Sequence, residues 1–313
     1  MQIIYAKAFL LFSYYGILFM NTDIRAREIE DNLNETLKNF VFNFRIKDNK
    51  SVLQIENFSE IYFPNTAGGN IAGGSYSWTN QKHKNGGIHE PAMIAALLTL
   101  RGYHKNLNPV FFDIGALYGY FSLIVQSLFS NVTVCAFEMN PDSFAALENN
   151  IIENKHLNDN NVRCINVGLS DRTLLQHKSK IEQFRLEEHA GDEGKPLDIM
   201  KLDDFCRDQN IYPTVMKIDV EGYQAKIIPG AMETISNNKP IILLEFDNAQ
   251  YMIDHFGCTN KIIVKPLFDL GYKLFWCGEQ RKNSSQFKHL TFNDLSTEHE
   301  KNSLGIFIHN DSI

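Results

Sequence analysis

The sequence predicts an α/β fold built on a mostly parallel β-sheet. From Pro109 onward, short apolar runs rich in β-branched and aromatic residues alternate with helical stretches. This alternation is typical of a parallel sheet that is covered by helices on both faces. The predicted strands are Val110–Ile114, Val132–Glu138, Val162–Leu169, Thr214–Val220 and Ile241–Phe246.

The C-terminal third predicts two more strands of a different kind. Two apolar runs, Tyr272–Cys277 and Leu304–His309, are separated by a polar stretch without helical periodicity. We expect them to pair as an antiparallel hairpin at the edge of the sheet, which then has seven strands in a domain of residues 89–313. Helices are expected after Tyr118, after Pro141, over Leu197–Asn210 and over Ala225–Asn237.

Residues 1–88 are predicted to form an N-terminal extension of that domain. Residues 8–20 are nearly uncharged, but a membrane span needs about 20 apolar residues, so they are either a packed or membrane-associated helix or a signal or anchor. The extension continues with an amphipathic helix in Asp23–Phe42, a hairpin in Ile46–Phe63 and a glycine-rich loop over Asn65–Gly87, which is a linker or a lid. A helix over His89–Tyr103 leads into the domain.

Composition narrows the class of partner. The formal net charge is −7 over 313 residues, whereas binding to nucleic acid normally requires a basic surface. The five cysteines are scattered singly, without the spacing of a zinc site or a disulfide framework. We therefore expect a cytoplasmic protein with a small-molecule partner and no nucleic acid, with membrane association through residues 8–20 as the alternative. The oligomeric state is not indicated.

Acidic and polar side chains follow the predicted strands. In an open α/β sheet, ligands bind outside the carboxyl ends of the strands, so we expect these side chains to meet at one edge of the sheet. They are Asp113, Glu138, Ser170, Asp171, Asp219, Glu221, Glu245 and Asp247.

The loop after the first strand, DIGALYG, indicates which ligand binds there. Gly115 and Gly119 permit a tight turn and a close approach of the ligand. The loop lacks the GxGxxG pattern of a dinucleotide site, and Asp113 would repel a phosphate. Glu138 is spaced to accept hydrogen bonds from both hydroxyls of a ribose. A ribose without a phosphate in an acidic site favours S-adenosylmethionine over NAD as the cofactor.

Several motifs resemble those of FkbM-type methyltransferases between about Glu90 and Phe246. They are FFDIGALYGYFSL, VCAFEMNPDSFAALENNI, NVGLSD, KLDDF, MKIDVEGYQAKIIPGA and KPIILLEF. The resemblance implies a class I, Rossmann-like methyltransferase fold. It also implies transfer of a methyl group from S-adenosylmethionine to a hydroxyl, commonly on a sugar or glycan or on another small molecule. Three residues depart from the family's usual motifs: Leu117 replaces Asn, Met139 replaces Pro and Gln224 replaces Glu.

The resemblance also implies roles for individual residues. Asp113, Gly115, Ala116 and Gly119 would line the methionine end of the cofactor. Glu138 would hold the ribose with Asn140 beside it, and Ser170 and Asp171 would approach the adenine. Asp219 and Glu221 would face the substrate, and Asp219 would also contact the cofactor.

An alcohol is a poor nucleophile while it is protonated, so a base is expected beside it. Asp219 and Glu221 are the first candidates because they lie two residues apart, on one face of the strand end. His89 is the next candidate and His83 a weaker one.

Several alternatives remain at this point. No metal is assigned, although Asp219, Glu221, Glu245 and Asp247 carry the oxygen ligands that Mg²⁺ prefers. Tyr76 and Trp78 offer aromatic faces to a sugar acceptor. Two other functions compete with methyl transfer: a binding module whose methyltransferase-type pocket has drifted, and an NAD-linked oxidoreductase.

Overall fold

The computed structural model describes residues 24–65, 74–83, 86–103, 108–157, 161–182, 185–187, 195–297 and 302–312. The apolar segment 8–20 lies outside these ranges, so its two interpretations stay predictions. Within the described ranges, no helix combines the length and the apolar character needed to cross a membrane.

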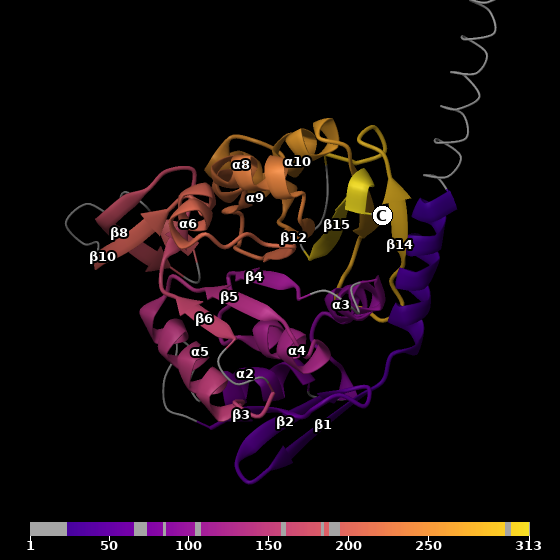
Figure 1. Cartoon of the computed structure of the whole chain (residues 1–313), viewed down its shortest axis with the longest axis vertical. Coiled ribbons are helices and arrows are strands. Elements are labelled where there is room, and N and C mark those ends of the chain that lie inside the picture. The colour runs from indigo at the N-terminus through magenta and orange to yellow at the C-terminus, as the bar shows by residue number, and fades with distance from the viewer. Residues whose placement is uncertain are drawn as a thin grey trace, which may run out of the picture.

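A central sheet of eight strands organises the molecule and confirms the predicted α/β class (Figure 1). Its order is β14-β13-β15-β12-β11-β4-β5-β6, and the strands from β12 to β6 are parallel. β15 lies antiparallel between β12 and β13. Its pairing with β13 confirms the antiparallel pairing predicted for the two C-terminal apolar runs. The chain order reverses between β4 and β11, which is where such sheets bind ligands. The strands are β4 (Val110–Ile114), β5 (Thr133–Phe137), β6 (Val162–Ile165), β11 (Val215–Ile218), β12 (Ile241–Phe246), β13 (Tyr272–Cys277), β14 (Phe287–Leu290) and β15 (Ser303–His309).

Helices cover both faces of this sheet (Figure 1). Successive strand residues alternate between two cores, so that Phe111 packs with one layer of helices and Phe112 with the other. One layer holds α3 (Pro91–Tyr103), α4 (Tyr120–Leu128) and α5 (Pro141–Glu153). The other holds α6 (Leu202–Gln209), α7 (Gln224–Ile227), the 3-10 helix η3 (Pro229–Ala231), α8 (Met232–Asn238), α9 (Ala249–Phe256) and α10 (Asn260–Asp269).

The N-terminal extension packs on the first layer. A helix over residues 24–39 buries Ile29, Leu33 and Leu37, in agreement with its predicted amphipathic pattern. It also covers β14, because Asn34 exchanges two hydrogen bonds with the backbone of Phe287. The free edge of the sheet is thereby paired with side chains.

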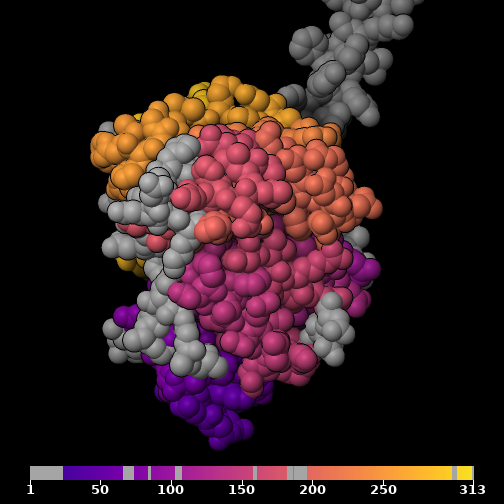
Figure 2. Space-filling view, turned by 90° about the vertical axis from the view of Figure 1, so that its left-hand side faces the viewer, coloured from indigo at the N-terminus to yellow at the C-terminus, as the bar shows by residue number. Residues whose placement is uncertain are grey.

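The predicted hairpin is a three-stranded antiparallel sheet of β1 (Phe42–Lys47), β2 (Lys50–Ile55) and β3 (Ile61–Pro64). In Figure 2 its indigo atoms lie at the opposite end of the molecule from the orange and yellow C-terminal elements.

Three parts of the sequence prediction are wrong. The Asn65–Gly87 loop contains a helix, α2 (Gly74–His83), whose Trp78 is buried against the domain. The polar stretch after β13 contributes an eighth strand, β14. The structure also contains a second sheet that was not predicted, with the strand order β7-β10-β8-β9. Part of it comes from the end of the predicted strand Val162–Leu169 and from the start of the predicted helix Leu197–Asn210, and the rest from segments for which no strand was predicted. Its strands are β7 (Gly168–Leu169), β8 (Leu174–Glu182), β9 (Arg185–Glu187) and β10 (Lys195–Met200).

Candidate active site

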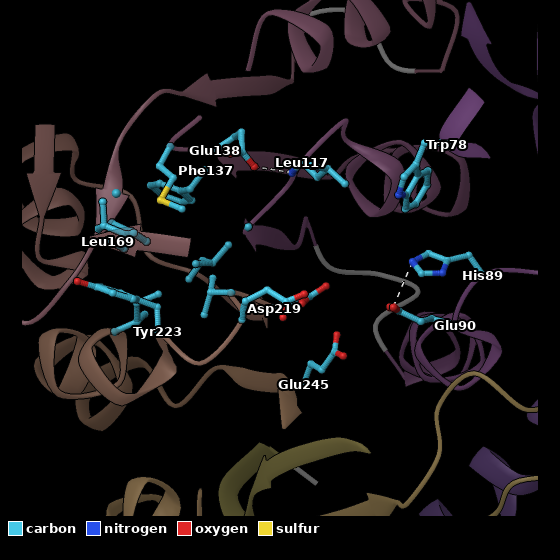
Figure 3. A pocket seen from close by; sticks show the side chains of 18 of the residues that line it. Trp78, His89, Glu90, Leu117, Phe137, Glu138, Leu169, Asp219, Tyr223 and Glu245 are labelled. Carbon is cyan, nitrogen blue, oxygen red and sulfur yellow. Dashed lines mark hydrogen bonds and ion pairs between the residues drawn. The ribbon is translucent and has the colours of Figure 1, made fainter. Parts of the chain in front are cut away.

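A cavity of about 330 Å³ opens at the carboxyl ends of β4, β5, β11 and β12. Figure 3 shows Leu117 and Glu138 at one side of it, and Asp219, Glu245, Glu90 and His89 at the other. The strand-end residues thus meet at the edge where the order of the sheet reverses.

The loop after β4 forms the first wall, and Gly115 fits there because it lacks a side chain. Its φ is 79°, and a Cβ atom at this position would lie 1.9 Å from the carbonyl oxygen of Asp219. The amides of Gly115 and Ala116 both donate to the carbonyl of Phe137, which fixes the loop against β5. The glycine therefore allows the loop after β4 to pack against the backbone that follows β11, and the predicted close approach of a ligand stays a prediction.

Glu138 connects this loop to the second strand. Its carboxylate accepts hydrogen bonds from the backbone amides of Leu117 and Asn140, both at 2.8 Å. Burial raises the pKa of Glu138 to about 7, against the effect of these two hydrogen bonds. The side chain lines the cavity and each oxygen keeps a lone pair, so it can accept hydrogen bonds from a ligand.

Three carboxylates form the second wall, which we call the acidic cluster: Glu90, Asp219 and Glu245. One oxygen of each lies within 4.8 Å of the others. Burial, followed by the charge of Asp219, raises the pKa of Glu90 to about 7 and that of Glu245 well above its usual value. At neutral pH the cluster therefore holds protons that isolated carboxyl groups would lose.

Cations surround the acidic cluster. Arg281 Nη2 lies 3.8 Å from Glu90 Oε1 and 3.7 Å from Glu245 Oε1. Lys217 Nζ lies 3.6 Å from Asp219 Oδ2 and 3.1 Å from Asp113 Oδ1. Part of the negative charge is thus balanced by the protein itself.

His89 lies beside Glu90, with 3.1 Å between its Nε2 and Glu90 Oε1. Burial lowers the pKa of His89 well below its usual value, so the imidazole is neutral at pH 7. We assign its proton to Nε2, which then donates to Glu90. His83, the weaker candidate, contacts the Tyr120 hydroxyl at 3.1 Å, and burial lowers its pKa to about 4.

Of the residues assigned to the cofactor, only Gly115, Glu138 and Asp219 line the cavity. Asp113 is wholly buried and accepts a hydrogen bond from Ser122, so it supports the loop from beneath instead of facing the cavity. Gly119 begins α4, and Asn140 caps α5 through the amides of Asp142 and Ser143. The others lie outside the lining as well: Ala116 and Ser170 are buried, and Asp171 pairs with Lys226 at 3.2 Å.

The acidic set suggested for Mg²⁺ is not the set that converges. Asp219 and Glu245 meet, and Glu221 lines the cavity at another position. Asp247 instead accepts a hydrogen bond from Gln224, one of the three departures from the family motifs. Leu117 and Met139, the other two departures, both line the cavity.

Sequence reasoning missed Glu90, Arg281 and the buried Lys217. Glu90 directly precedes the apolar helix α3, and a carboxylate at the start of a buried segment was the available signal. The backbone amide of Ala92 donates to the carbonyl of Gln280, and this bond brings the Glu90 and Arg281 segments together. A long-range contact of this kind leaves no pattern in the sequence.

This sheet order, with a cavity at the reversal point, places the chain among class I methyltransferases, whose methyl donor is S-adenosylmethionine. A model of the methyltransferase FkbM domain matches residues 113–274, more than half of the chain. The chain therefore belongs to the FkbM methyltransferase family, in agreement with the motifs in its sequence. No curated protein gives a significant match.

Solved structures with a similar fold are distant in sequence. The FkbM methyltransferase of Methylobacillus flagellatus KT is 15% identical, over 74% of this chain and 57% of its own, with a TM-score of 0.39. Fibrillarin of Aeropyrum pernix, solved with natively bound S-adenosyl-L-methionine, is 10% identical over 86% of this chain and 99% of its own, with a TM-score of 0.39. A precorrin-6y C5,15-methyltransferase of Geobacter metallireducens GS-15 is 16% identical over 68% and 84%, with a TM-score of 0.36.

Proposed function

We propose that the protein transfers a methyl group from S-adenosylmethionine to a hydroxyl group of a sugar, a glycan or another small molecule. The main support for this proposal is that two chemically different walls line the same cavity. One wall offers a buried carboxylate at a glycine turn, and the other offers an acidic cluster.

The first wall suits the cofactor. Glu138 has acceptor capacity for ribose hydroxyls, and Gly115 also lines the cavity. The apolar side chains that complete this wall suit an adenine ring; they are Phe137, Met139, Val167 and Leu169. When bound, S-adenosylmethionine supplies a methyl group made electrophilic by its sulfonium.

The second wall suits a hydroxylated acceptor. Carboxylates accept hydrogen bonds from hydroxyl groups, and buried ones do so strongly. Trp78 also lines the cavity, but Lys82 lies over its ring with 5.4 Å between Nζ and the ring centroid. A sugar that stacks on Trp78 would therefore have to displace the Lys82 side chain.

The test combines methyl transfer with ligand binding. We would incubate the protein with methyl-labelled S-adenosylmethionine and a panel of p-nitrophenyl glycosides, and titrate S-adenosylhomocysteine and NAD in parallel by calorimetry. We expect label on a hydroxyl oxygen, saturable binding of S-adenosylhomocysteine and no binding of NAD. Binding without transfer to any acceptor would favour the drifted module, and binding of NAD alone would favour the oxidoreductase.

Leu117→Asn should bind S-adenosylhomocysteine more tightly than the wild type and be more stable than Leu117→Ala by about 0.5–1 kcal/mol. Leu117 has a φ of 50°, a left-handed conformation that Asn tolerates better than other side chains do. Both substitutions remove the leucine side chain, so the difference between the stabilities of the two variants reports the cost of the left-handed backbone conformation. Calorimetry and denaturant unfolding measure the two effects, and equal stability of the two variants would contradict the backbone explanation.

A further inference from the structure

Glu90 has an unusual backbone for its position. Its φ is 48°, a left-handed conformation that is rare for residues other than glycine, and Pro91 follows it. A residue before a proline is normally extended. Strained conformations of this kind persist where the surrounding structure enforces them, and they concentrate at active sites.

The two carboxylate oxygens of Glu90 have different surroundings. Oε1 lies 3.1 Å from His89 Nε2 and 3.8 Å from Arg281 Nη2. Oε2 is buried and has no hydrogen-bond partner among the residues that the structure describes. A buried acceptor without a partner costs about 1–3 kcal/mol. Because Glu90 lines the cavity, a ligand that donates a proton or a hydrogen bond there would remove that cost.

The residues around Glu90 hold it in place without competing for the same role. Neutral His89 uses its Nε2 on Glu90, so this nitrogen is not available to the acceptor. Asp219 lies near Lys217, and Glu245 lies near Arg281. Figure 3 shows the carboxyl groups of Asp219, Glu245 and Glu90 turned toward one another across the cavity.

We propose that Glu90 is the general base, with Oε2 taking the proton of the acceptor hydroxyl. The O–H electron pair stays on the oxygen, an oxygen lone pair forms the new O–C bond, and the S–C pair leaves with the sulfur. Glu90 thus takes the role predicted for Asp219, Glu221 or His89, while His89 and Arg281 become positioning residues. The assignment rests on the proposed transfer to a hydroxyl.

The pH dependence of the reaction follows from the charges that face Glu90. Its pKa of about 7 is raised by burial and by the charge of Asp219, and it is lowered by Lys217, Arg281 and Lys82. A base must be ionised, so the rate should rise with pH through about 7 and then level off. Glu138 also titrates near 7, so the rate is measured in single turnovers at saturating donor, where donor binding does not limit it.

The experiment compares Glu90→Gln and Glu90→Asp with wild type and with Glu233→Gln, which changes an exposed glutamate outside the cavity. The acceptors are p-nitrophenyl glycosides and 4-nitrophenol. The hydroxyl of 4-nitrophenol is already about half ionised at neutral pH, whereas the sugar hydroxyls are fully protonated. We expect Glu90→Gln to slow transfer to the glycosides by about 10²–10³-fold and to remove the rise with pH. Binding of S-adenosylhomocysteine should stay within about threefold. Transfer to 4-nitrophenol should fall far less, and Glu90→Asp should recover part of the rate.

Each other outcome has a definite meaning. A rate for Glu90→Gln within threefold of wild type, or an equal loss with both acceptors and an unchanged pH profile, overturns the assignment. If EDTA abolishes the activity and Mg²⁺ restores it, the acidic cluster binds a cation, and this result also overturns the assignment of Glu90 as the base. Label found only on amines in added amino compounds would refute the proposed function in the wild type itself. The rate of Glu90→Gln with those amines would still show whether Glu90 takes part. If no probe accepts a methyl group, both proposals are contradicted.

Discussion

Replacing Lys217 with methionine should lower the free energy of unfolding by about 3–5 kcal/mol, because Asp113 would stay buried without its cation. Lys217 Nζ lies 3.1 Å from Asp113 Oδ1 and donates to the Gly115 carbonyl at 3.3 Å. Burial alone would lower the pKa of Lys217, but the charges of Asp113, Asp219 and Glu90 outweigh it and raise that pKa. The ammonium is therefore charged at neutral pH, and denaturant unfolding measures its contribution.

Two further variants separate the buried charge from an ordinary ion pair. Lys226, on α7, forms a half-exposed pair with Asp171. Lys226→Met breaks this pair and should cost less than about 1 kcal/mol. Asp113→Asn combined with Lys217→Met should be about 1–2 kcal/mol more stable than Lys217→Met alone, since the wholly buried Asp113 is then no longer an unpaired charge. If Lys217→Met were as mild as Lys226→Met, the buried network would not stabilise the fold.

The fold was predictable where strands are buried on both faces. β12 and β13 have the predicted bounds, Ile241–Phe246 and Tyr272–Cys277, and every residue of β12 is buried. A continuous apolar run between polar segments marks such strands in the sequence. The antiparallel pairing of β13 with β15 was predictable as well, because no helix was expected between these two apolar runs.

Elements held by polar contacts were not predictable. In α2, Ser75 Oγ lies 3.1 Å from Asn150 Oδ1 and Asn80 accepts a hydrogen bond from Ser51, so its polar side chains face the protein. Hydrophobic periodicity cannot reveal such a helix. The predicted strand Val162–Leu169 breaks at Asn166 because its side-chain amide donates to the carbonyls of Glu138 and Met139. These bonds replace backbone pairing, and β7 then joins the second sheet.

The residues of the candidate site also fall into a predictable and an unpredictable group. Glu138 and Asp219 were predicted from strand ends, because topology alone brings strand ends together. Glu90 and Arg281 lie outside the parallel strands, before α3 and after β13, and only long-range packing places them at the cavity. The proposed base therefore lies in the part of the site that the ends of the parallel strands do not reveal.

Glu138→Ala should raise the Kd of S-adenosylhomocysteine about 100-fold, because hydrogen bonds to a charged group contribute about 1.5–3 kcal/mol. The loss includes the support that the carboxylate gives to the Leu117 amide in the turn. Glu138→Gln should be milder, about tenfold, since its amide oxygen replaces only one of the two acceptors. Glu148→Ala, at an exposed position of α5, is the matched control and should leave the Kd unchanged.

The pH dependence of binding gives this prediction a second, independent readout. Burial raises the pKa of Glu138 to about 7, so its carboxylate is largely protonated at pH 6 and largely ionised at pH 8. The ionised group accepts hydrogen bonds more strongly, so wild-type affinity should increase from pH 6 to pH 8. In Glu138→Ala that increase should disappear, whereas a merely loosened turn would lower affinity equally at both pH values. An alanine variant that kept both its affinity and the increase with pH would show that a different group recognises the ribose.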